Sequence, residues 1–309
     1  MLLSDVKIVE VSPRDGLQNE QQLISKALKI QLTNRLIQAG FQNVEAASFV
    51  SPKWVPQMAD GSAVIAGLKP EQSSGRRAVI SALVPNLKGL EAALAAGVDE
   101  VVIFGAASEA FSQKNINCSV QDSIDRFKPV AELAKARSLR LRASISCCLG
   151  CPYQGEVSAS AVLKVVEQML ALGVDEIDIA DTIGVGTANK VKALMLDVAS
   201  VVDLNRVAGH FHDTYGQAVA NVVASVEAGV RIFHSSVAGL GGCPYAKGAT
   251  GNVATEDILY LMQGLGLSTG VDLDAVVGIG AWISQTLGKP NASRAGNALW
   301  ARQKQEVCS

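Results

Sequence analysis

Residues 207–229 have the sequence VAGHFHDTYGQAVANVVASVEAG. The first part, residues 207–212, is typical of a buried strand, and residues 217–228 have the pattern of a helix. The helix pattern ends at Gly229, because glycine readily takes the left-handed conformation that closes a helix. This stretch is therefore one strand followed by one helix, and it predicts the form of the units around it.

Strand–helix units of this kind recur along the chain. Together with the stretch above, they occupy residues 6–39, 43–67, 78–96, 100–136, 139–172, 176–202, 207–228 and 231–264. Similar turns close the helices at Gly40, Gly97, Gly173 and Gly229. The sequence therefore predicts an α/β fold, the (β/α)8 or TIM barrel, in which parallel strands close into a cylinder surrounded by helices.

The predicted barrel covers residues 1–267, which we expect to form the catalytic domain. Residues 268–309 follow as an extra C-terminal helical segment. Residues 272–287 have a helical pattern, and we expect this helix to pack on the barrel. The polar stretch after Pro290 predicts a mobile tail.

The composition excludes several classes of protein. The chain has 309 residues, 49% of them hydrophobic, so it can bury a large core. Its 27 Lys and Arg nearly balance its 29 Asp and Glu, which argues against nucleic acid or a membrane surface as a partner. No apolar run reaches the roughly 20 residues of a membrane span. Six cysteines are too few for a disulfide framework in a chain of this length. We expect a cytoplasmic protein with a small substrate.

Two of the three histidines, His210 and His212, stand two residues apart at the end of a predicted strand. Alternate residues of a strand point to the same face, so both imidazoles share one side. Imidazole is the commonest metal ligand in proteins, which favours a metal site. A hydrogen-bonded structural pair is the alternative, and oxygen ligands from elsewhere in the chain would decide between the two.

Barrel closure supplies such ligands. Active sites of this fold lie at the carboxyl ends of the strands, and the last strand lies beside the first. Asp15 follows the first strand, and Asn252 ends the glycine-rich stretch after the last one. With His210 and His212 they offer two nitrogens and two oxygens, a mixture that suits Mg²⁺ or Mn²⁺ and also admits Zn²⁺ or Co²⁺.

Four segments then reveal a resemblance that extends along most of the chain. The segments are residues 13–20, 48–58, 212–218 and 236–246. All four resemble the 3-hydroxy-3-methylglutaryl-CoA lyase family. The most specific parts are the run Ser-Pro-Lys-Trp-Val-Pro-Gln-Met and the cysteine-containing loop. The resemblance implies an acyl-CoA substrate that is cleaved to acetyl-CoA and acetoacetate, in leucine breakdown or ketone-body formation. We also expect a homodimer.

The resemblance also implies roles for individual residues. A divalent cation would bind at Asp15, His210, His212 and Asn252. Arg14 would contact the acyl oxygen of the substrate, and Cys243 would transfer a proton. Glu45 and Asp181 would support the site. His210 and Asp15 are the candidates for the base that takes the proton of the substrate hydroxyl.

This sequence departs from the family pattern at His234, where relatives have an aspartate before the Ser-Ser-Val-Ala-Gly run. Several assignments also have a structural alternative. Arg14 and Asp15 could form a surface ion pair, Glu45 could make a structural hydrogen bond inside the barrel, and Asp181 could cap the turn after its strand. The cysteines in Cys148-Leu149-Gly150-Cys151 could pack in a loop or take part in redox chemistry.

Two other functions fit the same fold. The first is a synthase or aldolase of the same superfamily that condenses an acyl-CoA with a 2-oxo acid, and the cysteine loop argues against it. The second is a barrel that binds metal but has no activity. A complete ligand set together with Arg14 and Cys243 favours an enzyme.

Overall fold

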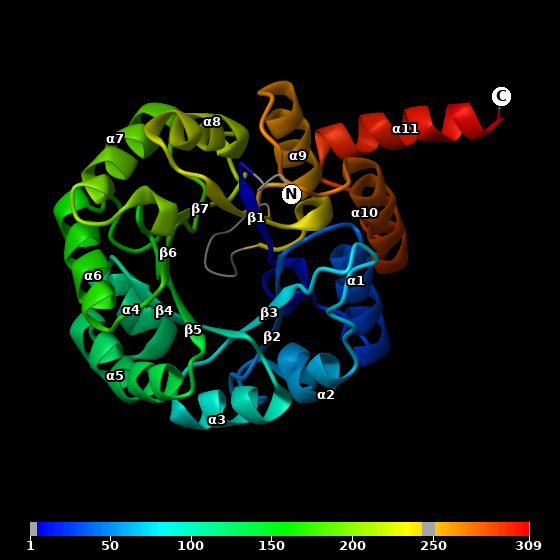
Figure 1. The fold of residues 1–309 in the computed structure, drawn as a ribbon. Helices are drawn as coiled ribbons and strands as arrows, with labels where there is room; N and C mark the ends of the chain where they lie inside the picture. Colours follow the sequence, from blue (N-terminus) through cyan, green and yellow to red (C-terminus); the bar gives the residue numbers. More distant parts are fainter. Residues whose placement is uncertain (1–4, 243–250, 309) are drawn as a thin grey trace.

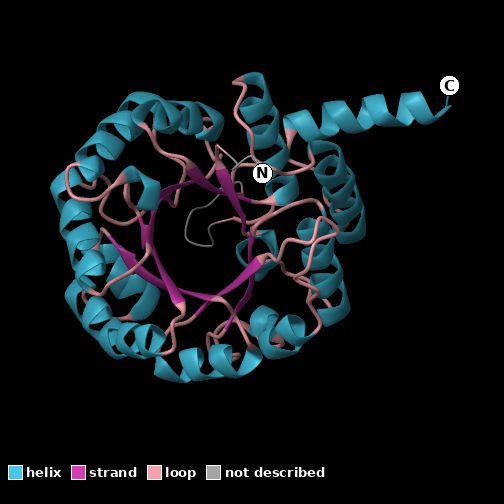
Figure 2. Cartoon of the chain, viewed as in Figure 1, coloured by secondary structure: helices cyan, strands magenta, loops and turns pink. Residues whose placement is uncertain are grey.

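The computed structural model describes residues 5–242 and 251–308. Its strands are all parallel and form one closed barrel in sequence order (Figures 1 and 2). They are β1 (Lys7–Glu10), β2 (Asn43–Ser48), β3 (Val79–Leu83), β4 (Glu100–Ala106), β5 (Arg140–Ser146), β6 (Glu176–Asp181), β7 (Val207–Phe211) and β8 (Ile232–Ser235). The predicted (β/α)8 barrel is confirmed, since β1 pairs with both β2 and β8.

Helices surround the barrel as predicted (Figure 2). One helix follows each strand in turn, and these are α1 (Lys26–Gln38), α2 (Gly61–Ala66), α3 (Leu87–Ala96), α5 (Val120–Ala136), α6 (Ala159–Ala171), α7 (Ala188–Ala199), α8 (Ala218–Ala228) and α9 (Thr255–Gly264). Short helical turns also occur at Ser12–Gly16 (η1), Pro56–Met58 (η2), Leu204–Arg206 (η3) and Val237–Gly239 (η4). The glycines of the repeated turn all have positive φ, from 82° at Gly97 to 112° at Gly229. This conformation disfavours other residues and is the physical reason for the repeated pattern.

One helix of the barrel was not predicted. Helix α4 (Glu109–Ile116) lies between β4 and α5. The side chain of Ser108 caps its first turn by accepting a hydrogen bond from the amide of Phe111 at 3.1 Å. The helix is short and has a weak apolar pattern, because only Phe111 and Ser112 within it are buried.

The C-terminal segment differs from the prediction. Helix α10 (Leu273–Leu287) is present as expected, but the predicted mobile tail forms a further helix, α11 (Arg294–Cys308). Asp257 of α9 holds the start of α11, since it accepts hydrogen bonds from the Ser293 hydroxyl and the Ala295 amide, both at 2.8 Å. The far end of α11 projects away from the barrel (Figure 1). The sequence of α11 is polar and therefore did not predict a helix, although the helix begins with a capped, partly buried turn.

The apolar core lies mainly between the strands and the surrounding helices. The inside of the barrel is different, because ionisable side chains from several strands are almost fully buried there; they include Glu45, Glu100, Arg142, Glu176, Asp178 and His234. None of the helices in the described residues is long and apolar enough to cross a membrane.

Candidate active site

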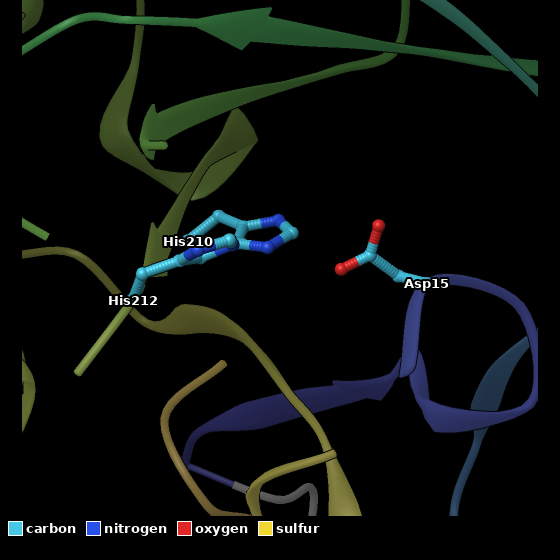
Figure 3. A group of neighbouring side chains, drawn as sticks. All are labelled: Asp15, His210 and His212. Carbon is cyan, nitrogen blue, oxygen red and sulfur yellow. The ribbon is translucent and has the colours of Figure 1, made fainter. Parts of the chain in front are cut away.

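The predicted metal ligands meet at the carboxyl end of the barrel. Asp15 lies in η1 directly after β1, His210 lies in β7, and His212 follows that strand. One ligand atom from each of these residues lies within 4.8 Å of the others (Figure 3). Barrel closure therefore brings together side chains that are almost 200 residues apart in the sequence.

Asn252 joins this group because the chain returns to β7 after the glycine-rich stretch. His212 and Asn252 form an antiparallel bridge, and the amide of Val253 donates to the carbonyl of Phe211 at 2.9 Å. The Asn252 side-chain nitrogen donates to Asp15 Oδ2 at 2.7 Å and to a backbone carbonyl at 3.2 Å. These two bonds fix the orientation of the amide, and its oxygen faces His210.

The contact between Asn252 and His210 indicates that a cation fits here. Asn252 Oδ1, which can only accept, lies 2.7 Å from His210 Nε2. His210 Nδ1 lies 3.1 Å from Asp178 Oδ2, so it is the nitrogen that donates. Two lone pairs would otherwise face each other between Nε2 and Oδ1, and the contact is attractive only with a proton or a metal ion between them. Burial lowers the pKa of His210, but the charge and hydrogen bond of Asp178 outweigh it and raise the pKa to about 9.

His212 has the opposite character. Burial and the neighbouring His210 lower its pKa to about 4, so the imidazole is neutral at pH 7. Its Nδ1 is buried and has no hydrogen-bond partner among the described residues. A neutral imidazole is the form that binds a metal ion. His212 is thus ready to act as a ligand, whereas His210 must first release a proton.

Asp15 and Arg14 form a partly buried pair rather than the surface ion pair considered above, since 22% of the Asp15 side chain is exposed. Arg14 Nη1 donates to Asp15 Oδ1 at 2.6 Å, and Arg14 is only 8% exposed. Burial raises the pKa of Asp15, but Arg14 and the two histidines outweigh it and lower the pKa to about 2. Asp15 is therefore a carboxylate at neutral pH, as an oxygen ligand must be.

Glu45 holds the other side of Arg14. Its Oε1 accepts from Arg14 Nε at 2.5 Å, and its Oε2 forms an ion pair with Arg142. Burial raises the pKa of Glu45, but the charges of Arg14 and Arg142 outweigh it and lower the pKa. Glu45 thus lies between two arginines, where it fixes the guanidinium of Arg14.

The sequence did not single out Arg142 or Asp178 as site residues, and the structure places both directly beneath the ligands. We call Glu45, Arg142, Asp178 and His234 the interior network. Arg142 contacts His234 at 3.1 Å, His234 contacts Asp178 at 3.0 Å, and Asp178 contacts His210. The sequence signal that could have identified Asp178 was the alternation Glu-Ile-Asp-Ile in residues 176–179. It places two carboxylates inside the barrel, where they require partners.

Asp181 is fully buried at the end of β6. It accepts hydrogen bonds from the amides of Val185 at 3.1 Å and Gly186 at 2.8 Å. Burial raises its pKa to about 6. These contacts are those of the turn cap considered as the alternative, and no hydrogen bond or ion pair among the described residues joins Asp181 to the cluster of ligands.

The cysteines divide into two groups. Cys243 falls outside the described residues, although the preceding Gly242 accepts a hydrogen bond from Asn19 at 2.8 Å through its carbonyl. Cys148 and Cys151 are buried thiols after β5, which agrees with packing in a loop. The site as described therefore contains the ligand cluster, Arg14 and the interior network.

Comparison with known proteins gives one consistent family. The HMGL-like family model matches residues 5–283. A Pseudomonas aeruginosa protein named 3-hydroxy-3-isohexenylglutaryl-CoA/hydroxy-methylglutaryl-CoA lyase is 57% identical over 297 residues, which cover 96% of this chain and 98% of that protein. The hydroxymethylglutaryl-CoA lyase of Pseudomonas mevalonii is 52% identical and covers 97% of this chain and 99% of that protein.

Solved structures agree with these relatives. The crystal structure of hydroxymethylglutaryl-CoA lyase from Pseudomonas aeruginosa has a TM-score of 0.93 and 56% sequence identity, and the match covers 97% of this chain and 99% of that one. An HMG-CoA lyase from Acinetobacter baumannii in complex with coenzyme A and 3-methylmalate has a TM-score of 0.91 and 34% identity, with 96% of each chain covered.

Proposed function

This chain belongs to the HMGL-like family, and from that premise we propose how its barrel cleaves 3-hydroxy-3-methylglutaryl-CoA. The enzyme is a carbon–carbon lyase, and its products are acetyl-CoA and acetoacetate. The observation that carries the proposal for the site is the convergence of Asp15, His210, His212 and Asn252 at one end of the barrel.

We propose that these four residues hold a divalent cation, Mg²⁺ or Mn²⁺. The supporting observations are the mixed nitrogen and oxygen ligand set and the contact between His210 Nε2 and Asn252 Oδ1. When bound, such a cation supplies a Lewis acid that lowers the pKa of a hydroxyl and orients its substrate.

We propose that Arg14 stabilises the negative charge that develops on the thioester oxygen as acetyl-CoA departs. Arg14 donates through Nε to Glu45 and through Nη1 to Asp15, and its Nη2 donates to none of the described residues. A buried guanidinium held on two sides is preorganised, which makes it effective against charge that appears only in the transition state. Glu45 would act by fixing Arg14, and Asp181 by shaping the turn after β6.

Cys243 is the proposed donor of the proton that completes acetyl-CoA. A thiol has an ordinary pKa of about 8.5, so it can donate a proton and regain it near neutral pH. The proposal depends on the sequence of the loop, because this residue lies outside the described part of the chain. An acyl-CoA substrate is supported further by the coenzyme A complex of the Acinetobacter baumannii relative. We also propose a cytoplasmic homodimer that serves leucine breakdown or ketone-body formation.

A coupled assay for acetoacetate tests this function. Purified enzyme is freed of metal with a chelator and then supplied separately with Mg²⁺, Mn²⁺, Zn²⁺ or Co²⁺. We expect acetoacetate release to stop in the metal-free enzyme and to return with Mg²⁺ or Mn²⁺. Full activity in the presence of the chelator would contradict the metal proposal. Parallel assays with 3-hydroxy-3-isohexenylglutaryl-CoA would measure how strictly the enzyme selects the methyl group of its substrate.

A further inference from the structure

All three histidines of this chain lie in one cluster. The ring of His210 is 5.6 Å from the ring of His212 and 5.3 Å from the ring of His234. His234 stands opposite His210 in the register of β7 and β8, and it is only 1% exposed. The reaction described above uses His210 and His212 but gives His234 no role.

The neighbours of His234 determine which of its nitrogens carries a proton. Its Nε2 lies 3.1 Å from Nη1 of Arg142, and a guanidinium can only donate, so Nε2 must accept. Its Nδ1 lies 3.0 Å from Asp178 Oδ2, which accepts. Glu176 Oε1 is 3.7 Å from Nε2 and lies beyond hydrogen-bond distance. These contacts assign His234 the tautomer with its proton on Nδ1, an atom that also lies 3.4 Å from His210 Nδ1.

Asp178 depends on this proton for its orientation. Its Oδ2 accepts from His234 Nδ1, from His210 Nδ1 at 3.1 Å and from the Ser144 hydroxyl at 2.9 Å. Its Oδ1 is buried and has no hydrogen-bond partner among the described residues. The hydrogen bonds to Oδ2 thus hold the whole carboxylate in place, and the same oxygen fixes the orientation of the His210 ring.

We propose that His234 is a positioning residue for the cation site. As the Nδ1–H tautomer it links Arg142 to Asp178 and keeps Asp178 Oδ2 in line with His210 Nδ1, so that His210 Nε2 points at Asn252. This inference rests on the proposed metal site. Partners that orient a ligating histidine in this way affect metal affinity by about 10–100-fold.

The same side chains have another conceivable use. One ligand atom each from Asp178, His210 and His234 lies within 4.8 Å of the others, as it would around a second metal ion. The tautomers argue against this use, because both histidines present a protonated Nδ1 to the same carboxylate oxygen. We therefore expect one Mn²⁺ per chain in a calorimetric titration, and two would overturn the assignment.

Nitrogen NMR of the wild-type protein tests the tautomer directly. With only three histidines, ¹⁵N-histidine labelling gives a small set of ring signals, and His234→Gln identifies those of His234. At pH 7 in metal-free protein, we expect His234 Nδ1 to be protonated and its Nε2 to be unprotonated. A proton on Nε2, alone or together with one on Nδ1, would overturn the proposal.

Matched substitutions test the positioning role. His234→Asn keeps an N–H group at the position of Nδ1, His234→Gln keeps a polar group near the position of Nε2, and His234→Leu keeps neither. Calorimetry with Mn²⁺ should show about 10–100-fold weaker binding in His234→Gln and His234→Leu, and much of the wild-type affinity in His234→Asn. The KM for the acyl-CoA at saturating Mn²⁺ should stay unchanged in all three variants.

A role in packing alone predicts a different order. His234→Asn and His234→Gln would then bind Mn²⁺ equally well, or all three variants would match the wild type, and either result would refute the proposal. A failure of the proposed function is distinguishable, because it would appear in the wild-type enzyme as acetoacetate release that does not depend on the metal.

Discussion

The ligand cluster and the interior network lie next to each other but differ in how their polar groups are satisfied. In the interior network the charges of Glu45 and Arg142 neutralise each other, and His234 links Arg142 to Asp178. In the ligand cluster His212 Nδ1 has no described partner, and His210 Nε2 faces an acceptor. The first region is satisfied largely by the protein's own groups, although Asp178 Oδ1 and Arg142 Nε have no hydrogen-bond partner among the described residues. The second region would gain a further partner, for His212, from the proposed cation.

This difference separates buried polar groups that stabilise the fold from buried polar groups that are available to bind a ligand. A buried charge with a partner supports the fold only while the partner is present, because the desolvated group left behind is strongly unfavourable. A buried ligand without a partner weakens the fold slightly and gains its partner on binding. Substitutions in the two regions should therefore affect different measurements.

The largest effect on stability should come from Arg142→Met. Arg142 is fully buried and pairs with Glu45 Oε2, so the variant removes a buried positive charge that lies beside Glu45 and Glu100 and leaves Glu45 with Arg14 alone. We expect the free energy of unfolding, measured with urea, to fall by about 3–5 kcal/mol. Lys192→Met is the control at the surface, since Lys192 pairs with Glu227 and both side chains are about half exposed. The control should lose less than about 1 kcal/mol, and equal losses would contradict the distinction.

Arg14→Met should mainly lower kcat. Arg14 joins the two regions, and the charge that it would stabilise is strongest in the transition state. Removal of one such donor typically costs about 10²–10³-fold in kcat. Steady-state kinetics at saturating metal provides the measurement, with Arg14→Lys as the control that keeps the charge but loses the planar fork. An unchanged kcat with a raised KM would make Arg14 a substrate anchor only.

His212→Ala should affect metal binding more than the stability of the fold. His212 Nδ1 has no hydrogen-bond partner among the described residues, and burial already keeps the imidazole neutral. We expect the affinity for Mn²⁺, measured by calorimetry, to fall by more than the roughly 10–100-fold that is typical for loss of an outer partner. His212 is buried, so the cavity left by its ring also costs some stability, but the free energy of unfolding of the metal-free protein should fall by less than the loss of about 3–5 kcal/mol expected for Arg142→Met. Full metal affinity would show that His212 is not a ligand.

Glu256→Gln represents a third case, a buried carboxyl held by amides, and its effect should appear in the pH dependence of stability. Glu256 is fully buried and accepts hydrogen bonds from the Ala238 amide, the shorter at 2.9 Å. Burial raises its pKa to about 8, so at pH 7 the folded state retains a proton that the unfolded state has released. The free energy of unfolding contributed by this group therefore falls as the pH rises from about 4.5 through about 8.

Glutamine keeps the shape of the protonated carboxyl and cannot ionise. The fall in Tm between pH 6 and pH 9 should therefore be smaller in Glu256→Gln than in the wild type. Asp257→Asn is a suitable control, because Asp257 is the neighbouring carboxylate and caps α11. An identical pH dependence of Tm in wild type and Glu256→Gln would show that Glu256 is not protonated in the folded state.

The sequence predicted most of the fold because the strand–helix units and their glycine turns are local signals. Helices α4 and α11 were not predicted, because their sequences are polar or weakly patterned. The contacts that stabilise their first turns come from Ser108 and Asp257. The meeting of Asp15 with His210 and Asn252 was predictable because barrel closure follows from the fold class.

The interior network was not predictable in the same way. Its contacts depend on strand register, which pairs Ser144 with Asp178 and His210 with His234. A shift of one residue would turn these side chains out of the barrel, and sequence spacing alone does not fix that shift. The opposite pKa shifts of His210 and His212 also depend on the assembled barrel. Burial lowers the pKa of both histidines, Asp178 on β6 outweighs it at His210, and the charge of His210 adds to it at His212.

The closure of β1 against β8 also has a consequence for biosynthesis. A growing chain that has reached residue 212 already contains Asp15, His210 and His212, but it lacks both β8 and Asn252. Until β8 is made, one edge of β1 has no strand to pair with, and open strand edges invite association with other chains. The ribosome must therefore complete most of the protein before Asn252 exists, so an unfinished chain cannot assemble the proposed metal site.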